Sequence, residues 1–127
     1  MYPDISARNP RGAVLTNTIV ASHTLAGFWG SSIDADHTLF FNSGTPCGGG
    51  ASCTNNLTDD PDFVNPATED YHIGPDSAAI DAGVYAGVMR DIDNEPRLGA
   101  PDLGADEYWA PGVLKIVYLP LVLRHAP

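Results

Sequence analysis

The sequence predicts an all-β protein built from coils of a parallel β-helix. Two stretches, which begin at Ala13 and Ser32, are short, alternating and rich in β-branched residues, as is typical of strands. At an offset of 20 residues they match in residue type: polar, Thr, aliphatic, apolar, apolar, small polar. A β-helix coil takes about this many residues, so we expect Thr18 to stack on Thr38. Two repeats also arise by chance, and an ordinary β-sandwich remains the alternative.

The composition favours many turns and argues against two classes of partner. Gly (13) and Pro (11) interrupt nearly every window in which a helix could propagate, and 127 residues suffice for one domain or part of one. A net charge of −10 repels nucleic acid and anionic membrane surfaces. This acidity suits an extracellular protein or carboxylates that hold Ca²⁺, although plain solvation of the surface is the simpler explanation.

Cys47 and Cys53 predict a disulfide. Five residues separate them, three of them Gly, and such a loop closes easily into a small ring. The spacing is wrong for a paired metal knuckle, so the alternative is two free thiols. A disulfide implies an oxidising compartment. The start of the chain, from Met1 to Arg8, has no signal-peptide pattern, so we expect a fragment of an extracellular or cell-surface protein.

Five sequence blocks follow one another between Asp60 and Tyr108. They are Asp60-Pro-Asp-Phe-Val-Asn-Pro, Asp70-Tyr-His-Ile, Ser77-Ala-Ala-Ile-Asp-Ala-Gly, Asp91-Ile-Asp-Asn-Glu-Pro-Arg and Pro101-Asp-Leu-Gly-Ala-Asp-Glu-Tyr. In this order they resemble the C-terminal signature of bacterial surface proteins of the choice-of-anchor Q group, with pectate-lyase-like coils. Ala78 stands where that signature usually has Pro, and Asn94-Glu95 replaces Gly-Asn.

The resemblance implies the C-terminal coils and cap of a right-handed parallel β-helix, with two to three coils and a terminal strand. We expect coils with a Gly-rich disulfide loop over 1–58, a Pro/Gly-rich cap over 59–109 and a tail over 110–127. Ten apolar side chains are expected to close the open end of the core: Phe63, Val64, Tyr71, Ile73, Ile80, Val84, Ile92, Leu98, Leu103 and Tyr108.

The tail predicts either a last strand or a sorting and anchoring signal. Its Tyr118-Leu-Pro-Leu-Val resembles a terminus common on exported proteins of filamentous green bacteria. The apolar run from Val113 to Leu123 is too short, and too broken by Pro120, to span a bilayer as a helix.

The densest polar cluster suggests a Ca²⁺ site formed by Asp91, Asp93 and Asp102. Alternating oxygens in Asp91-x-Asp93 resemble the opening of a Ca²⁺ loop. The Gly and the bidentate Glu of an EF-hand loop are missing. We therefore expect a simpler site, in which residues of the cap hold one Ca²⁺ ion. The competing interpretation is that these carboxylates pair with Arg90 and Arg97 and accept hydrogen bonds from turn amides.

Enzymatic function is not predicted for this chain. Polysaccharide lyases on β-helices use a Lys or Arg base on the coils, and neither residue occurs between Arg11 and Arg90. Asp34 and Asp36 could form a glycosidase pair, but acidic turn residues are far commoner. His23 and His37 lie 14 residues apart, which does not match the coil period, so each is expected to be an isolated histidine.

We therefore predict a non-catalytic structural or adhesive module that contacts polysaccharide or cell-surface glycan. Phe28 and Trp29 are the candidates for glycan contact, unless they are half-buried core aromatics. One alternative is the non-catalytic end of a polysaccharide lyase or glycoside hydrolase whose active site lies upstream. Another is a Ca²⁺-dependent binding module. The exposed first coil, Ala13 to Val20, is expected to allow self-association.

Overall fold

The computed structural model describes residues 12–22 and 26–113, with side chains described outside 26–29. These residues form strands and one short 3₁₀ turn, which confirms the all-β class. The elements are β1 (Ala13–Ala21), β2 (Ala26–Trp29), β3 (Ile33–Phe41), β4 (Thr45–Gly48), β5 (Ser52–Thr54), β6 (Phe63–Asn65), η1 (Pro66–Thr68) and β7 (Asp70–Ile73). No helix among the described residues is long and apolar enough to cross a membrane.

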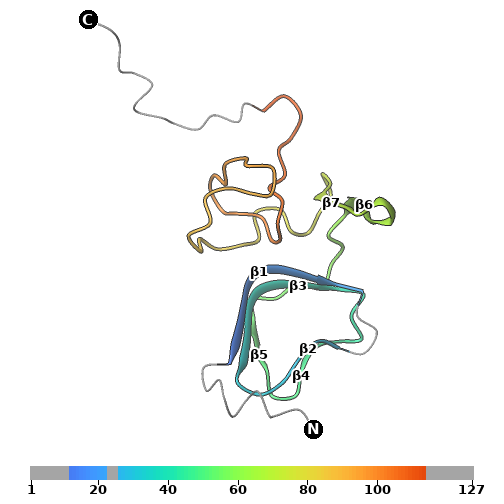
Figure 1. Ribbon diagram of the computed structural model, residues 1–127, viewed down its shortest axis with the longest axis vertical. Coiled ribbons are helices and arrows are strands. Elements are labelled where there is room, and N and C mark those ends of the chain that lie inside the picture. Colours follow the sequence, from blue (N-terminus) through green and yellow to red (C-terminus); the bar gives the residue numbers. More distant parts are fainter. Residues whose placement is uncertain (1–11, 23–25, 114–127) are drawn as a thin grey trace, which may run out of the picture.

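The first five strands alternate between two parallel sheets. Sheet A has the order β1-β3-β5, and sheet B pairs β2 with β4. In Figure 1 the two sheets lie on different sides of one ring. Thr18 pairs with Thr38 and Ile19 with Leu39, which is the register that the 20-residue offset predicts. From β3 to β5 the offset shortens, because Asp34 pairs with Ser52.

Residues with left-handed backbone recur at matching positions of neighbouring strands of sheet A. The first set lies within β1 and β3 and directly after β5: Asn17, His37 and Asn55. The second set precedes the three strands: Gly12, Ser32 and Gly50. The third set directly follows β1 and β3: Ser22 and Asn42. Asn, His and Gly tolerate this conformation better than β-branched residues do. β1 and β3 each bend along their length in Figure 1, and the first set accounts for the bend.

The central strand of sheet A, β3, has buried side chains on both of its faces. Leu39 and Phe41 pack in an apolar cluster with Ile73, Ala79 and Leu103 from the later loops. Thr38 and Phe40, 0% and 2% exposed, alternate with them and therefore point to the other side of the sheet, into the ring. The loops after β5 thus cover the outer face of sheet A, and Figure 1 shows them beside the ring.

The cap over 59–109 stays a prediction, and the ten apolar side chains expected in it divide between buried and exposed positions. Of the ten predicted side chains, Ile73 and Leu103 are buried in the outer cluster, with Phe63, Ile80 and Tyr108 packed against it. Val84 is half-buried and is held through its backbone by Asn17. The prediction is wrong for Val64, Tyr71, Ile92 and Leu98, which are 59%, 56%, 67% and 51% exposed. Irregular loops lack a period, so their sequence does not show which apolar side chains face inward.

The predicted disulfide is confirmed and joins β4 to β5. Cys47 and Cys53 are joined, with Cα atoms 6.5 Å apart. Just beyond β5, the Asn56 amide accepts the Thr38 N–H at 2.7 Å and donates to the Ala35 carbonyl at 3.1 Å. These two hydrogen bonds connect Asn56 to β3 beyond the last paired residues of β3 and β5. The predicted terminal strand and Tyr118-Leu-Pro-Leu-Val lie outside the described residues.

Candidate functional site

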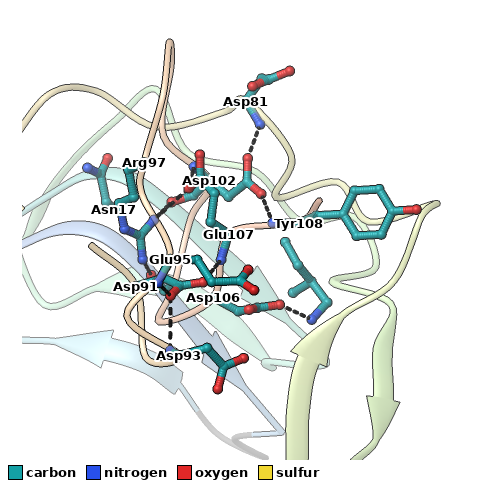
Figure 2. A network of polar contacts seen from close by, with 12 residues as sticks. Asn17, Asp81, Asp91, Asp93, Glu95, Arg97, Asp102, Asp106, Glu107 and Tyr108 are labelled. Carbon is teal, nitrogen blue, oxygen red and sulfur yellow. Dashed lines mark hydrogen bonds and ion pairs between the residues drawn. The ribbon is translucent and has the colours of Figure 1, made fainter. Parts of the chain in front are cut away.

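The third, fourth and fifth sequence blocks meet in a network of polar groups, which Figure 2 shows. Arg97 and Glu107 form an ion pair at 3.0 Å, and their side chains are only 8% and 6% exposed. The Arg97 guanidinium also donates to the carbonyls of Asp102, at 3.0 Å, and Gly104, at 2.9 Å. The planar fork of Arg suits such convergent acceptors better than Lys would. Arg97 therefore joins the fourth block to the fifth.

The acidic residues of this network accept hydrogen bonds from backbone N–H groups. The two oxygens of Asp102 accept from Asp81 at 2.7 Å and Tyr108 at 2.6 Å. Asp91 accepts from Asp93 and Glu95 with one oxygen and from Glu107 with the other. Burial raises the pKa of Asp102 and of Glu107, since desolvation opposes ionisation more strongly than these hydrogen bonds favour it.

The residues of the predicted Ca²⁺ site are distributed over this network. Asp91 and Asp102 hold turns of the backbone, as the competing interpretation expects, and only Asp93 belongs to a group with metal-ligand spacing. Arg97 pairs with Glu107, whereas Arg90 donates to the Asn94 carbonyl at 2.7 Å. Ca²⁺ binding itself stays a prediction.

Sequence reasoning missed a second polar cluster, centred on His72. This residue is in β7, and its Nδ1 lies 2.5 Å from Asp70 while its Nε2 lies 2.7 Å from Asp93. Hydrogen bonds to Asp70 and then Asp93 raise the His72 pKa to about 9, and the same contact with His72 lowers the pKa of Asp70. In the sequence, the only indication of this cluster is that His72 occupies the variable position of the block Asp70-Tyr-His-Ile.

Asp106 approaches the same histidine from the fifth block. It is 6% exposed, and its Oδ2 accepts the Ile73 N–H at 2.9 Å, so β7 and the block are tied together beside the ring of His72. Burial raises the pKa of Asp106, and the nearby charge of His72 partly opposes that rise. Ligand atoms of His72, Asp93 and Asp106 lie within 4.8 Å of one another.

A cleft of about 700 Å³ runs along β1 beside this cluster. Five consecutive β1 residues, Asn17 to Ala21, line one side, and the opposite side includes Phe63, Tyr71 and Asp106. Consecutive residues of a strand point alternately to both of its faces, so the cleft follows the edge of β1. Within the described part of the chain, β1 is an edge strand of sheet A. The cleft therefore joins the edge of β1, an exposed aromatic ring and a carboxylate.

The other predicted site residues lie away from the cleft. Asp36 accepts from Asn55 and Thr54, each at 2.9 Å, and these hydrogen bonds, with one from His37, lower its pKa. Asp36 thus serves the turn of the third coil, while Asp34 is exposed at the start of β3. The backbones of Phe28 and Trp29 are in β2. Their side chains, like His23, lie outside the described residues.

Comparisons with protein-family models, with curated proteins and with solved structures return no match for this chain.

Proposed function

We propose that the chain is a non-catalytic structural or adhesive module from the end of an exported, right-handed parallel β-helix protein. The observation that carries this proposal is the recurrence of left-handed residues at matching positions of successive coils, such as Asn17, His37 and Asn55. A stacked solenoid needs its corners in register, whereas a sandwich has no reason to repeat them. Parallel strands joined by crossovers are almost always right-handed, which supports the same handedness here.

The use of the acidic residues supports a structural role. A catalytic carboxylate needs free oxygens in reach of a substrate. Asp91 and Asp102 use both oxygens on backbone N–H groups, and one oxygen of the buried Glu107 accepts from Arg97 and from the Asp102 N–H. The acidic side chains of the blocks therefore hold the irregular loops in place on sheet A by hydrogen bonds to their backbone.

An exported location follows from the same proposal and is supported by the disulfide. Cys47 and Cys53 join two successive coils at β4 and β5, and such bonds persist in oxidising compartments. The resemblance to bacterial surface proteins indicates attachment to, or release from, the cell surface.

The adhesive part of the proposal assigns glycan contact to the cleft beside β1. Tyr71 is 56% exposed there, and aromatic faces next to carboxylates and hydroxyls are a common way to hold sugar rings. Phe28 and Trp29, on β2, are the second candidates.

The test is an assay of the purified full chain against a panel of polysaccharides that includes polygalacturonate. We expect no turnover, measured as reducing ends and as unsaturated product, together with binding on a glycan array that Tyr71→Ala reduces at least tenfold. Val64→Ala is the matched control, because Val64 is similarly exposed but does not line the cleft. Turnover that a second, independently purified preparation reproduces would refute a non-catalytic role. Absence of glycan binding would leave a structural role only.

A further inference from the structure

The cluster around His72 has the composition and spacing of a transition-metal site. Its three ligand atoms come from three separate segments: β7, the turn at residues 91–95 and the fifth block. Ligands of a tetrahedral ion lie roughly 3.4 Å apart when each is about 2.1 Å from the metal. The ligand atoms lie within 4.8 Å of one another, and His72 Nε2 lies 2.7 Å from Asp93 Oδ2, so this pair must separate slightly and longer distances must contract to reach that geometry.

We propose that His72 Nε2, Asp93 Oδ2 and a carboxylate oxygen of Asp106 bind one first-row divalent transition-metal ion of the Zn²⁺ type, with water completing the coordination. One imidazole nitrogen with two carboxylates selects such ions over Ca²⁺, which prefers six to eight oxygen ligands. The site differs from the predicted Ca²⁺ set, with which it shares Asp93 alone.

Asp106 is an observation independent of the exposed acids. Its side chain is buried, and Ile73 fixes one oxygen at 2.9 Å, so the carboxylate is held beside His72 before any ion arrives. Burying a carboxylate is unfavourable unless a cation or several donors compensate it. An ion between Asp106 and His72 supplies that compensation directly.

Asp70 provides the outer partner that metal-binding histidines usually have. It contacts Nδ1 at 2.5 Å, which leaves Nε2 as the nitrogen directed at Asp93. A carboxylate on the remote nitrogen fixes the ring orientation and increases the basicity of the ligand. Asp70 is therefore a positioning residue in this site.

The test is titration calorimetry of the untagged full chain, stripped of metal with chelator, against ZnCl₂ and separately against CaCl₂ at pH 8. We expect one Zn²⁺ per chain and no Ca²⁺ at this site. His72→Gln should weaken the binding of Zn²⁺ at least tenfold, and Asp70→Asn by about 10- to 100-fold. His37→Gln is the matched control, because His37 also contacts a carboxylate, Asp36, but belongs to β3.

Since His72 is exposed, its variant should fold, and circular dichroism verifies this. The proposal is refuted if His72→Gln binds Zn²⁺ as tightly as the original chain, or if the original chain binds none at pH 8. Equal losses in His37→Gln and His72→Gln would also refute it.

Discussion

At the residue scale, stability depends on a few buried polar side chains that replace regular hydrogen-bond ladders. The loops after β7 have almost no strand pairing, so their backbone N–H groups bond to side chains such as Asp91 and Asp102. Asp and Glu serve well here, because each carboxylate accepts several N–H groups at once. Removing one such side chain leaves more than one buried donor without an acceptor.

Arg97→Met should destabilise the chain strongly. The substitution keeps most of the apolar stem but leaves Glu107, 6% exposed, without its cation. Breaking one half of a buried ion pair costs about 3–5 kcal/mol. Urea unfolding followed by circular dichroism measures the change in the free energy of unfolding.

Arg90→Met is the matched control for that measurement. Arg90 is exposed and donates to one carbonyl, that of Asn94, so its loss should cost less than about 1 kcal/mol. Equal effects of the two substitutions would contradict the central place given to Arg97.

His72 should make the metal-free protein lose stability as pH rises. Its folded pKa of about 9 lies above the ordinary value of 6.5. The stabilisation is therefore fully present below pH 6.5 and is lost as pH rises through 9. The group is 45% exposed, so solvent screening limits the effect to about 1 kcal/mol or less.

The measurement compares urea midpoints of the chelator-treated chain at pH 6.5 and pH 9.5 with those of His72→Gln. The original chain should lose more stability between the two pH values than the variant does. Identical losses would show that the contacts with Asp70 and Asp93 contribute nothing in solution.

At the element scale, Asn17 connects β1 to the loops that cover sheet A. It has left-handed backbone, its amide bonds to both the N–H and the carbonyl of Val84, and its own carbonyl accepts the Gly104 N–H at 2.7 Å. Gly83 and Gly104 allow this approach, since a Cβ at either position would lie within 3 Å of Asn17 or Ile19 atoms. One residue thus bends the strand and holds the loops.

Asn17→Ala should lower the free energy of unfolding by about 2–3 kcal/mol, from two lost hydrogen bonds and a left-handed alanine. Asn17→Gly removes the same bonds but tolerates the backbone, so it should cost about 1 kcal/mol less. Asn17→Asp keeps the acceptor for the Val84 N–H and should be the mildest of the three. Chemical denaturation gives the order, and an alanine variant as stable as the aspartate variant would contradict this role.

The pairing of β1 with β3 could be predicted from sequence because strands carry a period that loops lack. The alternation in Thr18 to Ala21 and in Thr38 to Phe41 fixes both the register and the two faces of sheet A. The offset from β3 to β5 was not evident, because the disulfide loop shortens that coil and leaves only Ser52–Thr54 in the strand. The position of the loops on the outer face had no sequence signal, and neither did the convergence of His72 with Asp106, 34 residues later.

At the scale of the whole molecule, the edge of β1 offers a surface for self-association. β1 is the edge strand of sheet A in the described residues, and the loops donate to it at Asn17. An edge strand beside Val14, which is 65% exposed, is a template for pairing with a second copy. A net charge of −10 opposes that approach.

We therefore expect association that increases with protein concentration and with salt, because ions screen the repulsion between two acidic copies. Sedimentation velocity at low and high ionic strength measures it. Val14→Lys places a charge on the strand and should reduce the associated fraction severalfold at high salt. High salt is chosen because it screens the attraction between the added positive charge and the acidic second copy. Val64→Lys, at a position 59% exposed on β6, carries the same charge change and should leave association unaltered. A chain that stays monomeric under all these conditions would show that the bonds made by Asn17 and the loops protect this edge sufficiently by themselves.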